Sequence, residues 1–445
     1  MKNWVTKIHQ DESVTALKKL VSIPSVNTGD GKTYPPFGQA IADCLAQALS
    51  ICETLGMKTY SDPAGFYGYA DYGQGEELVA VLCHLDVVPE GDMSLWETPP
   101  FGAVIKDGKL VGRGSQDDKG PTIAALYGFK AVVDEGVPFK KRIRFVFGTD
   151  EETLWRCMEH YNDKEEQPTM GFVPDSSFPV TYAEKGLLQV KLIGPGSSDI
   201  TLACGDAFNI VPGRADFEGK DANALHEKMV EMGVTHTVDG NLITVNGKAV
   251  HASVAEQGVN AINQLAKGLV HIHPHPTVNF LAEKVRDETN GWSIFGEIKD
   301  EMTGELTFNV ASLSIDEKKS EIEIDLRIPV SFPIEDLVQK LKEVAESYGL
   351  DYYEFDRVAG LYVPKESDLV QTLMTIYQSK TNDLTQPLTS GGATYARTMK
   401  NMVAFGAHFP TTESLAHQSN EGISLDELFQ AMDIYAETIF QLCCE

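Results

Sequence analysis

Two long apolar runs, each ending in histidine or acidic residues, constrain the fold of this chain more than any other feature. Residues 77–89 (ELVAVLCHLDVVP) and 142–152 (RIRFVFGTDEE) begin as continuous apolar segments, which is typical of strands buried on both faces of a mostly parallel sheet. Between them lie a glycine-rich turn and a helical pattern over residues 119–135. This order of strand, helix and strand predicts a βαβ crossover and therefore an α/β fold.

The sequence pattern changes at about residue 185. Alternating strands such as residues 187–194 (LLQVKLIG) and 321–328 (EIEIDLRI) are each followed by an amphipathic helix, which indicates an α+β domain. Apolar strand character returns in the last part of the chain. We therefore predict an α/β domain with helices on both faces of its sheet, formed by residues 1–184 and 362–445 and interrupted by an inserted domain at 185–361.

The composition is that of a globular protein with a strong acidic excess. Hydrophobic residues make up 42% and charged residues 23% of the chain, which disfavours disordered and coiled-coil classes. The 37 basic and 65 acidic residues give a net charge of −28, which repels nucleic acid and anionic membrane surfaces. Seven scattered cysteines without a C-x-x-C pair, and the lack of a long apolar run, favour a cytoplasmic protein that binds neither nucleic acid nor membranes.

The first candidate site residues lie at the end of the first apolar run. His84 and Asp86 are two residues apart, so in an extended strand their side chains leave the same face, at the carboxyl edge where open α/β sheets place their sites. The histidine could bind a metal while the aspartate fixes its tautomer. A buried histidine paired with a neighbouring aspartate explains the same pattern without a metal.

Acidic clusters follow at two further positions. Asp117 and Asp118 lie in the glycine-rich turn before the predicted helix, where they could be helix caps or metal ligands. Asp150, Glu151 and Glu152 end the second apolar run. Three consecutive acids at a sheet edge repel one another unless a cation binds them, and we expect Glu151 and Glu152 to have separate roles there.

Two more residues fit the same edge of the sheet. Asp175 follows a short apolar run in FVPDSSFP, and His417 lies in the polar loop AHQSNEG before the last predicted helix. Alone, the aspartate is typical of a turn and the histidine of a loop. Acids and histidines that recur at strand ends around one predicted sheet edge favour a site for two metal ions.

Six segments occur together in an order that resembles a known enzyme family. They are HLDVVP, GRGSQDDKGP, GTDEE, PDSSFP, GKAVHAS and AHQSNE. The chain resembles the di-zinc exopeptidases, which include aminoacylases, carnosinases and succinyl-diaminopimelate desuccinylase, and most of all the PepV-type bacterial dipeptidases, over nearly its whole length. The resemblance implies a di-metal catalytic domain interrupted by a lid domain.

The resemblance also implies a set of metal ligands, residue by residue. Asp117 would bridge two divalent metal ions, with His84 and Asp175 completing the protein ligands of one ion and Glu152 and His417 those of the other. Zinc is the usual metal of the family, and this donor set also suits manganese or cobalt.

Two catalytic roles follow from the same resemblance. Glu151 would be the general base that takes a proton from a water held between the metals, and Asp86 would orient His84. The peptide bond that follows the bridging aspartate is typically cis in this family, which here is the bond between Asp117 and Asp118.

Further expected site residues lie in the inserted domain and in one later loop. The resemblance implies that His251 stabilises the developing oxyanion, that Asn209 contacts the substrate carbonyl, and that Arg327 binds the substrate's C-terminal carboxylate. Gly391 and Gly392 match a substrate loop whose N–H groups could bind the same carboxylate. Arg327 could instead be a surface strand residue paired with one of the many acids.

The preferred hypothesis is a metal-dependent dipeptidase that hydrolyses the amide bond of short peptides with a free C-terminal carboxylate. The second hypothesis is an N-acyl-amino-acid deacylase, including the desuccinylase type, that uses the same two metals. A third hypothesis is a binding protein in which the metals only stabilise the fold, but such a protein would not need the carboxylate of Glu151 beside the metal ligands.

The inserted domain also bears on assembly. Residues 209–238 and 320–355 both run strand, arginine, helix, strand, which indicates two similar halves. Many relatives dimerise through the lid, whereas PepV-type proteins have an enlarged lid whose halves resemble such a contact within one chain. We therefore predict a monomer that binds a small peptide substrate.

Overall fold

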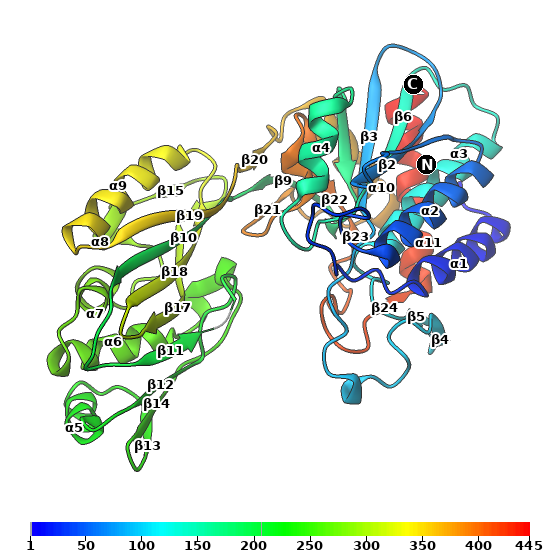
Figure 1. Cartoon of the computed structure of the whole chain (residues 1–445). Helices are drawn as coiled ribbons and strands as arrows, with labels where there is room; N and C mark the ends of the chain where they lie inside the picture. Colours follow the sequence, from blue (N-terminus) through cyan, green and yellow to red (C-terminus); the bar gives the residue numbers. More distant parts are fainter. Residues whose placement is uncertain (1, 206) are drawn as a thin grey trace. The chain divides into compact units, whose positions relative to one another are not determined.

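The computed structural model describes residues 2–205 and 207–445 and divides into two compact units. The α/β unit comprises the chain up to Tyr182 together with Val363–Leu388 and Thr394–Glu445, and the inserted unit comprises Ala183–Tyr362 and Thr389–Ala393. Figure 1 draws the inserted unit mainly in green and yellow. The chain enters this unit twice, the second time for a short segment only. The predicted boundaries at 184 and 361 stay a prediction.

A mostly parallel group of strands forms the middle of the large sheet. In spatial order, the strands are β1 (Lys58–Ser61), β2 (Tyr67–Tyr72), β6 (Arg142–Gly148), β3 (Leu78–His84), β7 (Met170–Val173), β22 (Met402–Phe405), β9 (Val180–Glu184) and β20 (Leu361–Tyr362), with β21 (Leu388–Ser390) beside β9. β3 is parallel to β6 and β7, and β7 is parallel to β22. The antiparallel pairs are β1 with β2, β2 with β6, and β9 with β22. This arrangement confirms the predicted fold class.

Helices cover both faces of this sheet, which is why β3 is buried along its whole length. The helices of the α/β unit are α1 (Lys7–Val21), α2 (Gln39–Thr54), α3 (Lys119–Asp134), α4 (Arg156–Lys164), α10 (Asp368–Thr381) and α11 (Leu425–Cys443). A Cβ on Gly68 of β2 would lie 2.9 Å from Cδ1 of Leu45, so α2 packs closely on that face. The neighbouring Tyr67 points to the other face, where its ring contacts Tyr161 of α4.

The inserted unit is built from antiparallel strands and helices around its own apolar core. One sheet has the order β11 (Leu202–Gly205), β17 (Thr307–Ile315), β18 (Lys319–Ile328), β10 (Gly186–Pro195), β19 (Asp351–Val358), and a second has β12 (Arg214–Glu218), β14 (Leu242–Asn246), β13 (His236–Asp239). The helices are α5 (Ala222–Glu231), α6 (Ala261–Ile272), α7 (Pro276–Phe280), α8 (Trp292–Phe295) and α9 (Ile334–Ser347), and β15 (Lys299–Asp300) pairs with β16 (Gly304–Glu305). The predicted halves share one element order, β12–α5–β13 and β18–α9–β19.

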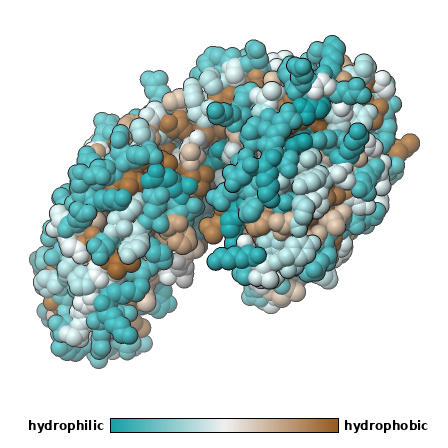
Figure 2. Space-filling view, turned by 45° about the horizontal axis from the view of Figure 1, so that its top comes forward, coloured by the Kyte–Doolittle hydropathy of each residue, from teal (hydrophilic) through white to brown (hydrophobic). Residues whose placement is uncertain are grey.

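The surface is hydrophilic over most of the face drawn in Figure 2, with hydrophobic residues scattered or in small groups. This pattern agrees with the large excess of acidic residues over basic ones. In the part of the chain that the structure describes, each helix is too short or too polar to cross a bilayer.

The carboxyl ends of the parallel strands meet at one edge of the large sheet. β3 ends at His84, and β6 and β7 lead into the turns that contain residues 149–152 and 174–175. A small sheet of β4 (Val104–Lys106), β5 (Lys109–Val111) and β24 (Gly422–Ser424) pairs the strand before α3 with the strand before α11. This pairing holds the Asp117 turn beside the loop that carries His417.

Candidate metal centre

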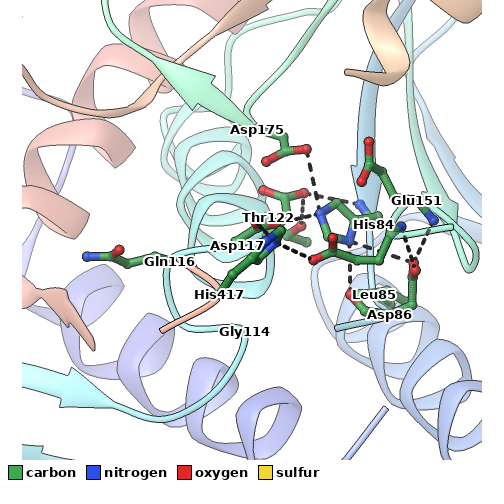
Figure 3. Close-up of polar contacts among 12 residues, drawn as sticks. His84, Leu85, Asp86, Gly114, Gln116, Asp117, Thr122, Glu151, Asp175 and His417 are labelled. Carbon is green, nitrogen blue, oxygen red and sulfur yellow. Dashed lines mark hydrogen bonds and ion pairs between the residues drawn. The ribbon is translucent and has the colours of Figure 1, made fainter. Parts of the chain in front are cut away.

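His84 is fixed at the end of β3 with one ring nitrogen toward the acidic residues. Its side chain is 1% exposed, and its Nδ1 lies 3.0 Å from the main-chain oxygen of Asp86, a bond that leaves Nε2 as the nitrogen for a ligand. Nε2 lies 2.8 Å from Oδ1 of Asp117 (Figure 3).

Asp117 lies between two histidines that are far apart in the sequence. Its Oδ1 faces His84, and its Oδ2 lies 3.1 Å from Nε2 of His417. The same nitrogen of His417 lies 3.0 Å from Oε1 of Glu152. The peptide bond between Asp117 and Asp118 is cis, as the resemblance implies. A carboxylate with one oxygen toward each imidazole is arranged as a residue that can bridge two cations.

The carboxylate of Asp86 holds the turn that carries the two glutamates. It is fully buried and accepts hydrogen bonds from the main-chain N–H groups of Glu151, at 3.1 Å, and Glu152, at 3.0 Å. Its distance to Nδ1 of His84 is 3.7 Å, longer than the distance from that nitrogen to the main-chain oxygen of Asp86. The indole N–H of Trp155 donates to the main-chain oxygen of Glu151 over 2.6 Å. The expected role of Asp86 in orienting His84 stays a prediction.

Asp175 and Glu151 complete the cluster. Asp175 follows β7, and its Oδ2 lies 3.6 Å from Nε2 of His84. Two overlapping groups, His84 with Asp117 and Glu152, and His84 with Glu151 and Asp175, each place their ligand atoms within 4.8 Å of one another. The structure thus brings the five predicted metal ligands and Glu151 to one edge of the sheet.

The cluster concentrates negative charge where little water reaches it. The side chains of Asp117, Glu152 and Asp175 are 17, 10 and 18% exposed. Burial, together with the neighbouring carboxylates, raises the pKa of Asp175 and Glu151 well above the usual range and that of Glu152 to about 7. Hydrogen bonds to Asp117 and Glu152 raise the pKa of His417 to about 11. Carboxylates and imidazoles gathered in this way fit divalent metal ions, which supply the missing positive charge.

Three of the predicted site residues lie side by side in the inserted unit. The main-chain oxygen of Asn209 accepts a hydrogen bond from the N–H of Ala252 over 2.8 Å, next to His251. The imidazole of His251 is exposed, with Nδ1 2.7 Å from the hydroxyl of Ser253. A Cβ on Gly391 would lie 2.9 Å from Cβ of Ser253, so this loop approaches the His251 segment as only glycine allows.

Arg327 connects β18 to the same loop. It is only 5% exposed, so the alternative of a surface residue is wrong, although its Nε and Nη2 do donate to an acid, Asp325, over 2.7 and 3.0 Å. Its Nη1 donates to the main-chain oxygen of Gly391 over 3.3 Å. The N–H of Gly392 donates to the hydroxyl of Ser390 over 2.9 Å. The roles of these residues toward a substrate stay predictions.

Sequence reasoning named Asp118 only as a possible cap or metal ligand, and it missed Glu421 and Arg113, although all three hold the segments that carry the ligands. Oδ2 of Asp118 accepts hydrogen bonds from the main-chain N–H of His84 and the hydroxyl of Thr122, both over 3.1 Å. Glu421 is fully buried and pairs with Arg113. The signal for Arg113 and Glu421 was their place inside the segments GRGSQDDKGP and AHQSNE, which says nothing of their contacts.

The comparison with protein families agrees with this geometry. The model for Peptidase family M20/M25/M40 matches residues 80–441. The chain belongs to this family. Its membership confirms the predicted relationship to metal-dependent peptidases, while the closer relationship to the PepV type stays a prediction.

Two relatives of this M20 family member span its length. A Staphylococcus haemolyticus protein named "Putative dipeptidase" is 34% identical over 471 residues, which cover 99% of this chain and 100% of that protein. A Staphylococcus aureus protein of the same name is 35% identical over 473 residues, again 99% of this chain and 100% of that protein.

Solved structures share the fold of this M20 family member at lower identity. An M20 family metallo-carboxypeptidase from Sulfolobus solfataricus has a TM-score of 0.62 at 17% identity, covering 96% of this chain and 98% of that one. Human carnosine dipeptidase 1 has a TM-score of 0.59 at 17% identity, covering 98% and 97%. The Bacillus subtilis YXEP protein, described as a dinuclear metal binding peptidase, has a TM-score of 0.54 at 10% identity, covering 98% and 99%.

Proposed function

We propose that the protein is a metal-dependent dipeptidase that hydrolyses the amide bond of short peptides with a free C-terminal carboxylate. The observation that carries this proposal is the carboxylate of Asp117, which has one oxygen toward His84 and the other toward His417. The two staphylococcal relatives named as dipeptidases support the substrate class.

We propose that the centre holds two divalent metal ions. Asp117 would contact both, His84 and Asp175 one, and Glu152 and His417 the other. The description of the Bacillus subtilis relative as dinuclear supports this number. Imidazole and carboxylate donors favour zinc, and manganese or cobalt also suit them. When bound, such metals would polarise the amide carbonyl and lower the pKa of water toward about 7.

Glu151 is the residue that we propose to move the proton. In the proposed ligand set, it is the carboxylate of the cluster that is not a ligand. Its carboxylate would take a proton from the attacking water and return it to the leaving nitrogen. Asp86 and Trp155 hold the main chain of Glu151, so its side chain stays at the cluster while its protonation changes.

The inserted unit is proposed to recognise the substrate. Asp325 accepts from Nε and Nη2 of Arg327 and Gly391 accepts from Nη1, so the second N–H groups of Nη1 and Nη2 are the donors proposed for the substrate's C-terminal carboxylate. The other proposed contacts are Asn209 with the substrate carbonyl, His251 with the developing oxyanion, and the N–H groups of Gly391 and Gly392 with the carboxylate.

Assembly and location are also proposals. We propose a monomer, because the two strand–helix–strand halves of the inserted unit lie within one chain. We propose a cytoplasmic location, because all seven cysteines are buried and free of disulfides, as suits a reducing compartment.

A panel of small substrates tests the proposed function. We expect Ala-Ala to be hydrolysed, and N-acetyl-Ala and Ala-Ala-amide to have kcat/KM values lower by about 100-fold or more, because each lacks one of the charged ends of a dipeptide. The measurement is release of alanine by chromatography, before and after metal chelation and after zinc is restored.

The panel separates the candidate functions. Loss of activity on chelation and its recovery with zinc are expected for the proposed enzyme. Faster turnover of N-acetyl-Ala than of Ala-Ala would replace the dipeptidase by the deacylase. Metal binding without turnover of any substrate would refute both enzymes.

A substitution at Arg327 tests recognition of the carboxylate. We expect Arg327→Lys to lower kcat/KM for Ala-Ala by about 100-fold, since lysine loses the planar fork that Asp325 and Gly391 now orient. The two proteins should hydrolyse Ala-Ala-amide equally well, because that substrate has no carboxylate to bind. Steady-state kinetics on both substrates measure this difference.

Arg357→Lys is the matched control for this test. Arg357 lies on β19, which is separated from β18 by β10 in the same sheet, and pairs with Glu335 and Glu354 at the surface. Its replacement should leave kcat/KM for Ala-Ala unchanged within a few-fold. An equal loss on Ala-Ala and Ala-Ala-amide in Arg327→Lys would show that Arg327 supports the fold rather than the carboxylate.

A further inference from the structure

A buried ion pair lies directly behind the residue proposed to bridge the metals. Nη1 of Arg113 lies 2.6 Å from Oε2 of Glu421, and the two side chains are 2% and 1% exposed. The residues lie at the same end of the antiparallel pair of β5 and β24: Arg113 follows β5, in the turn that leads to Asp117, and Glu421 precedes β24, in the loop that follows His417.

The carboxylate of Glu421 organises the turn that carries Asp117. Its Oε2 accepts a hydrogen bond from the main-chain N–H of Gly114 over 3.1 Å, and its Oε1 accepts from the N–H groups of Gln116, over 2.8 Å, and Asp117, over 3.2 Å. Three main-chain N–H groups that converge on one carboxylate form an anion-binding turn. The main-chain direction at Asp117 is therefore set by a residue from a distant part of the sequence.

Arg113 and the side chain of Gln116 hold the loop that carries His417. Nη1 of Arg113 also donates to the main-chain oxygen of Gln418 over 3.1 Å. The side chain of Gln116 donates to the main-chain oxygen of Glu413 over 2.9 Å and accepts from the N–H of Leu415 over 2.8 Å. These bonds hold the residues on both sides of His417, which has a φ of 64° that the loop must maintain.

We propose that Glu421 is a positioning residue, which holds the Asp117 turn directly and the His417 loop through Arg113. It thereby sets the spacing between the Asp117 carboxylate and the His417 imidazole, and with it the affinity for metal. This inference rests on the proposed metal centre. A pair that served only the fold would stabilise the protein without changing how tightly the metal is held.

The test measures zinc affinity in Glu421→Gln and Arg113→Lys, by competition with a chromophoric chelator. The glutamine keeps the shape of the side chain but turns an N–H group toward Arg113 or the turn, and the lysine keeps the charge but loses the fork. We expect zinc affinity to fall by about 10–100-fold in each variant, as is typical when groups that orient metal ligands are changed. If Glu421→Gln does not fold by circular dichroism, Arg113→Lys decides the test.

Arg144→Lys is the matched control. Arg144 is also buried and forms a bidentate pair with Asp71, at 2.7 and 2.8 Å, but neither partner belongs to the metal cluster. We expect Arg144→Lys to lower the melting temperature of the chelated protein and to keep zinc affinity within about 3-fold, as expected of a group that does not orient metal ligands.

Two results would overturn the inference. If Glu421→Gln and Arg113→Lys bind zinc as tightly as the wild type while they melt earlier, the pair serves only the fold. If the wild type binds none of zinc, manganese and cobalt, both the inference and the proposed function fail. A wild type that binds zinc but hydrolyses no dipeptide refutes the proposed function alone, and the affinities of the variants still decide the inference.

Discussion

Glu151→Gln is expected to lower kcat for Ala-Ala by about 10²–10⁴-fold while the protein keeps its metal. Glutamine has the shape of glutamate but cannot accept the proton of the attacking water. The main-chain N–H of residue 151 is bound by Asp86 and its main-chain oxygen by Trp155, so the substitution leaves the turn in place. Steady-state kinetics at saturating zinc, with metal content measured by mass spectrometry, check both parts.

Glu152→Gln is the matched control for this prediction. Glu152 is the next residue, its main chain is held by the same carboxylate of Asp86, and its side chain faces His417. Because Glu152 is a proposed ligand, the Glu152→Gln protein should lose metal and should regain part of its activity at high zinc. If Glu151→Gln lost metal in the same way, Glu151 would be a ligand and another residue would carry the proton. Turnover by Glu151→Gln near the wild-type rate would show that Glu151 takes no part in the reaction.

The place of the metal centre could be predicted because the carboxyl ends of parallel strands lie at the same edge of the sheet. The sequence shows His84 and Glu152 at the ends of two apolar runs, and β3 and β6 are neighbours in the sheet. An acid at the end of a buried strand has few partners other than a cation or an N–H group, so the pattern restricts the chemistry.

The period-two argument for Asp86 reaches only as far as the strand does. It holds only while the chain is a strand, and β3 ends at His84. Beyond that point, the carboxylate of Asp86 turns to the N–H groups of Glu151 and Glu152, and its main-chain oxygen lies closer to the histidine than the carboxylate does. The pattern identified Asp86 as a residue of the site but did not predict its hydrogen-bond partners.

Contacts between loops that are distant in the sequence could not be predicted. Arg113 and Glu421 pair across 308 positions, and a single sequence gives no sign of that contact. The loop that contains Gly391 and Gly392 divides between the two units, with Gly391 in the inserted unit and Tyr395 in the α/β unit, and no pattern in the sequence marks this division. Loops lack the periodicity that locates strands and helices, so their partners must be observed.

Asp117→Asn should weaken zinc binding by more than about 100-fold, beyond the loss typical of groups that only orient ligands, and should abolish detectable hydrolysis of Ala-Ala. Asparagine has one acceptor oxygen and one N–H₂ group, so it can offer an acceptor to only one of the two positions that Oδ1 and Oδ2 now face, beside His84 and His417. Metal content after dialysis and zinc competition measure the loss.

Asp118→Asn provides the control, because it makes the same chemical change one residue away. Its Oδ2 accepts from His84 and Thr122, and its buried Oδ1 has no hydrogen-bond partner among the described residues, so an amide can replace the carboxylate with little loss. We expect this variant to keep its zinc. If Asp117→Asn bound zinc as tightly as Asp118→Asn, the shared carboxylate would not be what joins the two histidines into one centre, and the two-metal proposal would lose its central ligand.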